Sequence, residues 1–433
     1  MAFRRALGPF DATMVVVGGI IGSGIFINPA FVAARLNSFS LILFVWALGG
    51  AVALIGAFIW AELGARFPRA GGQYVYLRDG LHPLAGFLYG WALLVSIEAG
   101  AIAAVALTFA EYALRLAGGP SAAAPAVAVA AIVLLSAINI AGVKPGSRVL
   151  NVFVVLKVAA LAILIVAGLV LPPSDGWTAS TQSVASPLAL GAALVPILFA
   201  YGGWQNANYV AEEVDRPEVT LPRALLAGTA IVVAVYVLAN VSYLRALGVS
   251  RLAQSPTPAA DAAELWFGPA GRTFVAAAIA ISTFGFLDLA ILAPTRVYYA
   301  LAADGCFPVA MGRLHPRFQT PVAAIVVQSV WSIALLATGT YAGLLNTVVF
   351  ADWIFFGSTA ATLFVFRSSQ RSRSGTGEPL PFRAPGYPIL PALFVAVAIW
   401  VVWSVVRDDP YRSAAGALLL AAGIPVFYFF KRR

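Results

Sequence analysis

The chain is poor in the residues that build disulfides, metal sites and nucleophilic active sites. Its 433 residues include one cysteine, Cys306, and two histidines, His82 and His315, each followed by a proline. A single cysteine excludes an intrachain disulfide, and two such distant histidines argue against a transition-metal site. The sequence also lacks a phosphate-binding glycine loop with its lysine and a G-x-S-x-G motif. We therefore expect no cofactor, no metal and neither an ATP-driven pump nor a typical membrane enzyme.

Charge is scarce as well. Charged residues make up 10% of the chain and hydrophobic residues 61%, with a mean hydropathy of +0.90. A soluble domain carries about 25% charged residues, so this surface is expected to face a lipid bilayer. The net charge of +9 would suggest nucleic acid in a soluble protein, but most Lys and Arg fall in alternate loops between the apolar runs. That bias follows the positive-inside rule. It predicts an inner (cytoplasmic) membrane protein with both termini cytoplasmic and no nucleic-acid partner.

Long uncharged or singly charged runs predict twelve membrane spans in one integral membrane domain. They lie near residues 10–36, 39–65, 83–114, 123–143, 147–171, 188–212, 221–245, 271–302, 321–340, 343–366, 388–407 and 411–430. The N-terminus loosely resembles a signal peptide, with Arg4 and Arg5 before an apolar stretch. Asp11 interrupts that stretch and no convincing cleavage site follows, so we interpret it as a retained first span.

Glycines interrupt the first span near its middle, in GGIIGSGIFINPA (18–30). Free backbone groups are tolerated in a membrane only where they line an enclosed or watered cavity. A break at residues 22–24 would leave carbonyls near Ile20 and Ile21 for an ammonium group, and the N–H groups of a second half-helix for a carboxylate. A free α-amino acid carries both charges. The same stretch contains a G-x-x-x-G pair, so close helix packing is the alternative.

A second interruption lies in the sixth predicted span, in FAYGGWQNAN (199–208). Each interruption falls in the first span of a set of five, and an odd number of spans inverts the second set relative to the first. Interrupted spans at matching positions of an inverted repeat indicate a transporter binding site. We expect Phe199 and the backbone of Gly202 and Gly203 to contribute to binding, with Gln205 as a further candidate.

Isolated charges inside spans are further functional candidates. Lys157 lies in the fifth span, where it could hold unwound carbonyls of the first span as a tethered cation. The alternative is that its ammonium reaches the cytoplasmic surface. Glu98, Asp288 and Asp352 lie in the third, eighth and tenth spans, and each could serve either the site or a structural hydrogen bond.

Residues 367–387, rich in Ser, Arg and Pro, are typical of a flexible cytoplasmic linker. We therefore predict a ten-helix core over residues 1–366, built of repeats at about 10–171 and 188–366. Residues 388–433 would add accessory helices 11 and 12.

Taken together, these motifs resemble the amino acid–polyamine–organocation transporter superfamily, and within it the L-type amino acid transporters. The similarity is carried by the two interrupted stretches and by FPRAGGQYVYL (67–77), ADGCFP (303–308) and VYVLANVSYLRAL (235–247). The resemblance implies an all-α membrane protein of the LeuT-like fold, an inverted five-helix repeat with helices 1 and 6 broken.

The resemblance also implies site residues. The substrate main chain would contact Ile21, Gly22, Ser23, Gly24 and Ile25, with Phe199, Ala200 and Gly202 opposite. Ile20 joins this set as the end of the first half-helix, and Gln205 and Asp288 would face the substrate side chain. Lys157 matches the family's fifth-span lysine, which resembles a substitute for a sodium ion, and Tyr236 matches a seventh-span tyrosine near it.

One departure concerns partners. Eukaryotic members pair with a glycoprotein through a cysteine between spans three and four, whereas residues 115–126 contain none, so no disulfide-linked heavy chain is expected. The predicted activity is sodium-independent exchange of neutral L-amino acids by alternating access. The alternative is proton-coupled uptake or exchange of cationic amino acids or polyamines, and remoter alternatives are an amino acid sensor, a channel or a polytopic enzyme.

Overall fold

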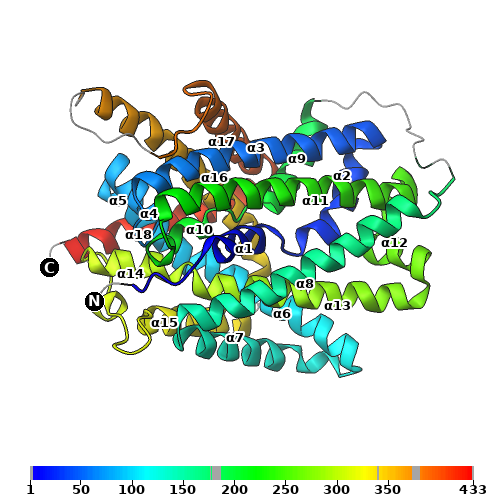
Figure 1. Cartoon of the computed structure of the whole chain (residues 1–433), viewed down its shortest axis with the longest axis horizontal. Helices are drawn as coiled ribbons and strands as arrows, with labels where there is room; N and C mark the ends of the chain where they lie inside the picture. The colour runs from blue at the N-terminus through cyan, green and yellow to red at the C-terminus, as the bar shows by residue number, and fades with distance from the viewer. Residues whose placement is uncertain (1–2, 176, 178–186, 339–340, 373–380, 432–433) are drawn as a thin grey trace.

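The computed structural model describes residues 3–431 except 176, 178–186, 339–340 and 373–380 (Figure 1). Within these residues the structure is all-helical, apart from one isolated β-bridge between Leu7 and Val214. The α-helices are α1 Pro9–Ile20, α2 Gly24–Leu36, α3 Phe39–Arg66, α4 Gln73–Gly80, α5 Pro83–Ala92, α6 Glu98–Ala117, α7 Ala124–Ile140, α8 Val143–Val170, α9 Pro187–Tyr201, α10 Asn206–Tyr209, α11 Pro217–Gln254, α12 Pro258–Phe267, α13 Pro269–Leu292, α14 Thr295–Ala303, α15 Val322–Thr338, α16 Tyr341–Ser372, α17 Ile389–Asp408 and α18 Pro410–Lys431. A π-helix spans Leu93–Ile97, and short 3₁₀ turns span Ser121–Ala123, Ala211–Glu213 and Val309–Gly312.

Several helix ends follow from local sequence. Pro83, Pro217 and Pro269 stand at helix starts, where the missing N–H costs nothing because it would have no intrahelical partner. Gly118 ends α6 with a φ of 67°, a left-handed conformation that suits glycine. The helix boundaries lie within a few residues of most predicted span boundaries, because the same proline and glycine positions end the apolar runs in the sequence.

Many of the helices are long and apolar enough to cross a membrane. Among the described residues eight helical segments meet that criterion, and the bent pair of α1 and α2 makes a ninth. The predicted spans near 188–212, 321–340 and 343–366 coincide with α9–α10, α15 and α16, which fall outside this count. A multi-pass helical membrane protein is thus confirmed, and the figure of twelve spans stays a prediction.

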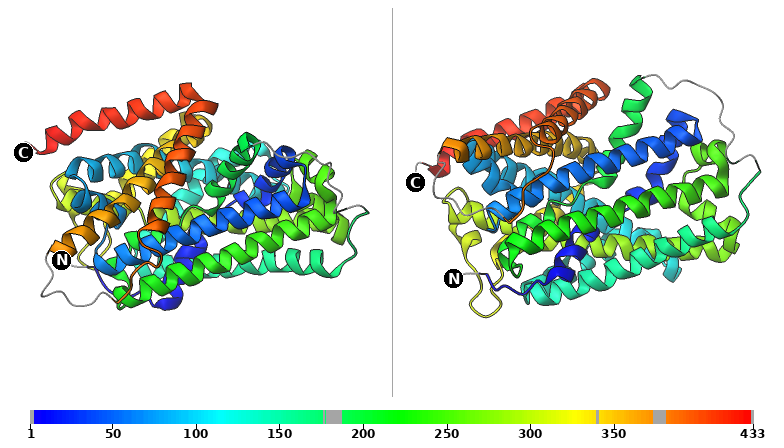
Figure 2. Two further views of the ribbon diagram at one scale, coloured as in Figure 1. Left: turned by 90° about the horizontal axis from the view of Figure 1, so that it is seen from above. Right: turned by 45° about the horizontal axis from the view of Figure 1, so that its top comes forward.

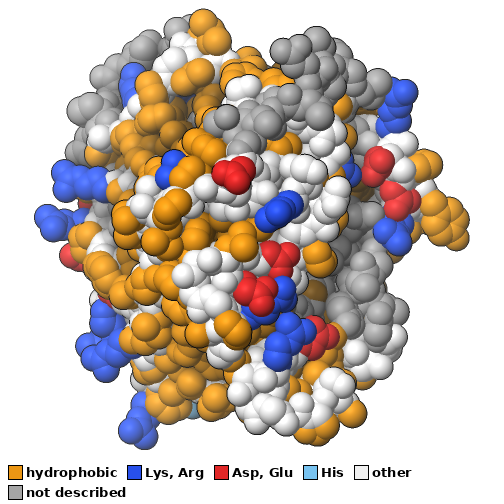
Figure 3. Space-filling view, turned by 90° about the vertical axis from the view of Figure 1, so that its right-hand side faces the viewer, with side chains coloured by type: hydrophobic (Ala, Val, Ile, Leu, Met, Phe, Trp, Pro, Cys, Tyr) orange, Lys and Arg blue, Asp and Glu red, His pale blue; other side chains and the backbone are white. Residues whose placement is uncertain are grey.

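The long helices run roughly alongside one another, and both termini lie at the same end of the molecule (Figures 1 and 2). α1 lies at the centre, where it packs against α8, α11 and α13. α2 packs against α9 and α11, while α6 packs against α13. Figure 3 shows the end opposite the termini, where apolar side chains predominate and charged ones occur in small groups. This arrangement places α1, which ends at the first break, inside the bundle.

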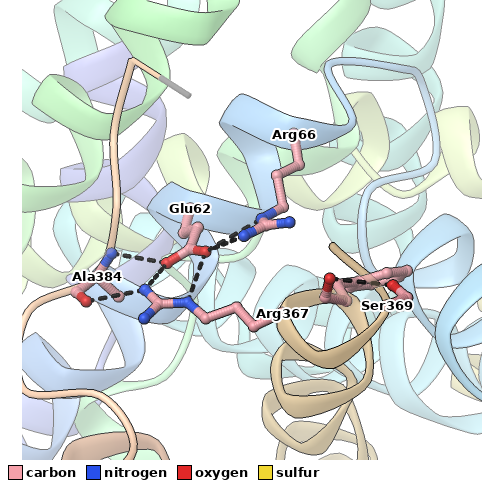
Figure 4. Close-up of polar contacts among 6 residues, drawn as sticks. Glu62, Arg66, Arg367, Ser369 and Ala384 are labelled. Carbon is pink, nitrogen blue, oxygen red and sulfur yellow. Dashed lines mark hydrogen bonds and ion pairs between the residues drawn. The ribbon is translucent and has the colours of Figure 1, made fainter. Parts of the chain in front are cut away.

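The described ends of the predicted linker are held by specific contacts (Figure 4). Residues 367–372 continue α16, and residues 373–380 lie outside the described part of the chain. The fully buried carboxylate of Glu62 accepts hydrogen bonds from Arg66 Nη2 at 2.6 Å, Arg367 Nε at 3.0 Å and the Ala384 amide at 2.7 Å. Arg367 also lies over the ring of Tyr387. One carboxylate thus ties the end of α3 to the end of α16 and to the segment before α17.

Candidate functional site

The first predicted break is present. α1 ends at Ile20, α2 begins at Gly24, and the two helix axes meet at 41°. A Cβ added to Gly22 would have no heavy atom within 4 Å, so the backbone here faces open space. The other glycine of the G-x-x-x-G pair, Gly18, is closely packed: a Cβ added there would lie 2.8 Å from Val154 Cγ2 on α8. The packing alternative therefore holds at Gly18 and does not hold at Gly22.

The second break lies against the first. α9 ends at Tyr201, and residues 202–205 separate it from the short helix α10. Gly203 has a φ of +118°, and a Cβ added there would lie 2.1 Å from the carbonyl oxygen of Gly19. Only glycine permits both that backbone conformation and that approach. The side-chain oxygen of Gln205 accepts the Gly203 amide at 3.0 Å, while Asn206 Nδ2 donates to the Gly203 carbonyl at 3.0 Å.

Lys157 on α8 places its ammonium at the end of α1. Its side chain is fully buried, and Nζ donates to the carbonyls of Gly18 at 3.0 Å and Ile21 at 2.5 Å. The side chain therefore does not extend to the surface. Because α1 stops here, those carbonyls lack the N–H partners that a continuous helix would supply.

Tyr236 on α11 connects the two breaks. Its hydroxyl donates to the carbonyls of Ile20 at 3.0 Å and Ala200 at 3.2 Å. Ser282 on α13 adds a donor, with its hydroxyl 3.3 Å from the Gly22 carbonyl. Side chains from three different helices thus satisfy the backbone of the interrupted segments.

A cavity of about 250 Å³ lies between the breaks. Eight of the predicted substrate-binding residues line it: Ile20, Gly22, Ser23, Gly24, Phe199, Ala200, Gly202 and Gln205. Ser23 and Gly24 bring the N-terminal end of α2 to the cavity, and Phe199 and Ala200 bring the C-terminal end of α9. A helix N-terminus favours negative charge and a C-terminus favours positive charge, so the cavity offers complementary ends to a zwitterion.

Three predicted substrate-binding residues do not line the cavity. Ile21 and Ile25 are fully buried in the apolar core, and Ile21 takes part through its carbonyl alone. Asp288 on α13 is also fully buried, but it accepts a hydrogen bond from Asn139 on α7 at 2.8 Å. Its helix face therefore points to α7, and we correct its assignment from the substrate cavity to a packing interface.

The cavity also contains residues that sequence reasoning did not select for the site. Asn206 and Thr283 line it, as do Trp353 and Phe356 on α16. Glu98 and Asp352, which were candidates only as isolated charges, line it as well. Hydrophobic periodicity could not assign a face to Asp352, Trp353 and Phe356, because the sequence around them on α16 is apolar on nearly all sides.

Toward the end that carries the termini, ionic contacts close the bundle. Arg296 and Glu213 are both fully buried and form a two-pronged ion pair, with Nη2–Oε1 and Nε–Oε2 distances of 3.0 Å. Burial raises the pKa of the Glu213 carboxyl, and Arg296 opposes that rise. At the C-terminal end of α14, the helix that carries Arg296, Arg78 and the Tyr74 hydroxyl share the carboxylate of Asp304.

No group of three His, Cys, Asp or Glu side chains that could hold a metal ion occurs among the residues that the structure describes. The polar groups at the cavity are backbone amides and carbonyls, amide side chains, hydroxyls and two carboxylates. Such a set can bind a small zwitterion.

Comparison with known proteins gives the family. Residues 7–423 match the amino acid permease family. The chain is 31% identical to the serine/threonine exchanger SteT of Bacillus subtilis (strain 168) over 433 residues, covering 99% of this chain and 98% of that protein. It is 31% identical to the human large neutral amino acids transporter small subunit 2 over 442 residues, covering 99% of this chain and 81% of that protein.

A third relative is the human cystine/glutamate transporter, 30% identical over 436 residues that cover 99% of this chain and 85% of that protein. All three relatives are named as amino acid transporters or exchangers, and none as an enzyme. With its broken helices, its central cavity and this similarity over almost its whole length, the chain belongs to the amino acid permease family.

Proposed function

We propose that this protein exchanges neutral L-amino acids across the cytoplasmic membrane by alternating access, without sodium. The full architecture would be twelve spans, with the inverted five-helix repeat and accessory helices predicted from the sequence. The observation that carries the proposal is the ammonium of Lys157 at the carbonyls of Gly18 and Ile21. The Lys157 ammonium, fixed at the end of α1, would take the place of a sodium ion bound from solution.

The substrate would lie in the cavity with its charged groups at the helix ends. Its carboxylate would accept hydrogen bonds from the free N–H groups at the start of α2, near Ser23 and Gly24. Its ammonium would lie at the C-terminal end of α9, because a helix C-terminus favours positive charge and the ammonium of Lys157 already occupies the end of α1. The side chain would extend past Phe199, a residue that is 42% exposed and lines the cavity.

Alternating access requires that the two ends of the cavity open in turn. The buried Glu213–Arg296 pair and the Asp304 contacts would close the end near the termini while the opposite end admits substrate. Opening toward the cytoplasm would then break these ion pairs, and a bound amino acid would favour that change by its contacts with both broken helices.

Proteoliposomes containing only this chain test the proposal. Vesicles loaded with unlabelled leucine should accumulate radiolabelled leucine or alanine equally in sodium-containing and sodium-free buffer, and empty vesicles should accumulate little. Activity of the single chain would also support the expectation that no disulfide-linked heavy chain is required. Strict sodium dependence would contradict the role given to Lys157.

Substitution at Ser23 tests the location of the site. Ser23→Trp should abolish exchange, because the indole would fill the cavity between the breaks. The matched control is Ser121→Trp, at an exposed position in the short turn Ser121–Ala123, distant from the cavity lining. Full exchange by Ser23→Trp would place the substrate elsewhere.

A further inference from the structure

Two carboxylates line the cavity beside the helix breaks. Glu98, at the start of α6, is 7% exposed, and Asp352, on α16, is half-buried. Within the described part of the chain neither carboxylate has an ion pair or a hydrogen bond, and neither Lys nor Arg lines the cavity. Lys157 is engaged with the carbonyls at the end of α1. The cavity therefore contains two acidic side chains with no basic counterpart.

The helix that carries Glu98 is irregular immediately before it. Leu93–Ile97 forms a π-helix that joins α5 to α6, and such turns occur frequently at functional sites. A carbonyl within it, that of Val95, accepts a hydrogen bond from Trp331 Nε1 at 3.0 Å. Because a π-turn adds a residue to the helical register, it changes the face on which the following residues lie. Here it accompanies a nearly buried glutamate on the cavity face.

Uncompensated carboxylates at membrane depth are costly, and they persist where function requires them. A cation between them would offset that cost. The neighbouring cavity wall contains Gly100, Ala101 and Ala104, whose small side chains leave space for an extended chain. Trp353 also lines this cavity, and an aromatic face attracts an ammonium group.

We infer that the cavity also binds amino acids whose side chain ends in an ammonium group, with Glu98 and Asp352 determining that specificity. The inference rests on the proposed function, because the same cavity must hold the α-amino and α-carboxyl groups at the helix ends. It widens the substrate class from neutral amino acids to those with a primary amine at the end of the side chain.

Lysine and norleucine provide a matched pair of probes. Both side chains contain the same unbranched four-carbon chain, and lysine differs by the ammonium group attached to its last carbon. Leucine-loaded proteoliposomes should accumulate radiolabelled lysine, and unlabelled lysine should inhibit leucine exchange. In Glu98→Gln and Asp352→Asn, lysine exchange should fall about tenfold or more, as expected for a lost charge-assisted contact. Exchange of leucine and norleucine should fall by a smaller factor, because their side chains carry no charge for the carboxylates to contact.

Glu111→Gln is the matched control, because Glu111 is an exposed glutamate on the same helix and does not line the cavity. It should leave both lysine and leucine exchange unchanged. If a cavity variant fails to fold, the wild-type protein in detergent still provides a test. Lysine should then raise its melting temperature more than norleucine does.

Several outcomes would overturn the inference. Wild-type exchange of leucine without competition by lysine would overturn it and leave the proposed function intact. Leucine uptake that follows a proton gradient without competition by lysine would also overturn it, because the carboxylates of Glu98 and Asp352 would then bind a proton in place of a substrate ammonium. An equal loss of lysine and leucine exchange in both variants would mark the carboxylates as structural. Absence of leucine exchange by the wild type would instead refute the proposed function, and the melting-temperature comparison would still decide the inference.

Discussion

Replacing Gly203 by alanine should force the two helix breaks apart. The added Cβ would lie 2.1 Å from the Gly19 carbonyl oxygen and 2.4 Å from its carbon. Those atoms belong to the backbone of α1 and cannot rotate away as a flexible side chain can. The φ of +118° at Gly203 is also unfavourable for any residue with a Cβ.

The expected cost follows from these two effects. A left-handed backbone conformation costs a residue with a Cβ about 1–2 kcal/mol, and inserting a carbon into a packed interior costs about 1–3 kcal/mol. Together they destabilise this junction by about 2–5 kcal/mol. That is a large part of the ~5–15 kcal/mol stability of a typical protein.

Gly22→Ala is the matched control, since a Cβ there would meet no heavy atom within 4 Å. Thermal unfolding in detergent and exchange in proteoliposomes should be measured for both variants. Gly203→Ala should lower the melting temperature and the exchange rate. Gly22→Ala should keep the melting temperature and alter only the apparent affinity, because its methyl group enters the cavity. Equal melting temperatures for Gly203→Ala and the wild type would refute the reasoning about contact between the breaks.

Three further predictions concern charged groups. Lys157→Met leaves two buried carbonyls without their donor and should cost about 2–6 kcal/mol, with loss of exchange measured in proteoliposomes; retained exchange would contradict its role. Glu62→Gln removes the negative charge that pairs with Arg367 and should lower the free energy of unfolding by about 3–5 kcal/mol. The melting temperature should fall, and an unchanged melting temperature would show that the ion pair contributes little. Asp288→Asn keeps an acceptor for Asn139 and should preserve leucine exchange, so a selective loss would return Asp288 to the site.

Much of the site's backbone was predictable from the sequence. Gly22 and Gly203 lie in stretches where a membrane helix has no reason to contain glycine unless its backbone must be free or closely approached. Lys157 was predictable for a related reason, because a mid-span ammonium needs oxygen partners and an interrupted helix supplies carbonyls. Both inferences depend only on the residue type and its position within a span, which can be read from the sequence alone.

The direction in which side chains point from the apolar helices could not be predicted from the sequence. Asp288 and Asp352 looked equivalent in the sequence, yet one bonds to α7 and the other lines the cavity. The cavity face of Glu98 depends in addition on the π-turn at Leu93–Ile97, which no residue pattern in the sequence indicates. The contacts of Glu62 with Arg367 and Ala384 join segments more than 300 residues apart, and only the folded chain brings them together.

The central claim is that the substrate lies between the two helix breaks, and cysteine protection tests it most directly. In a Cys306→Ser background, Ser23→Cys would place the one thiol at the cavity, and Ser121→Cys would place it on an exposed turn as a control. Saturating leucine, at ten times its dissociation constant, should slow alkylation of Ser23→Cys about tenfold and leave Ser121→Cys unaffected. Unchanged alkylation of Ser23→Cys in a variant that still binds leucine would contradict the account.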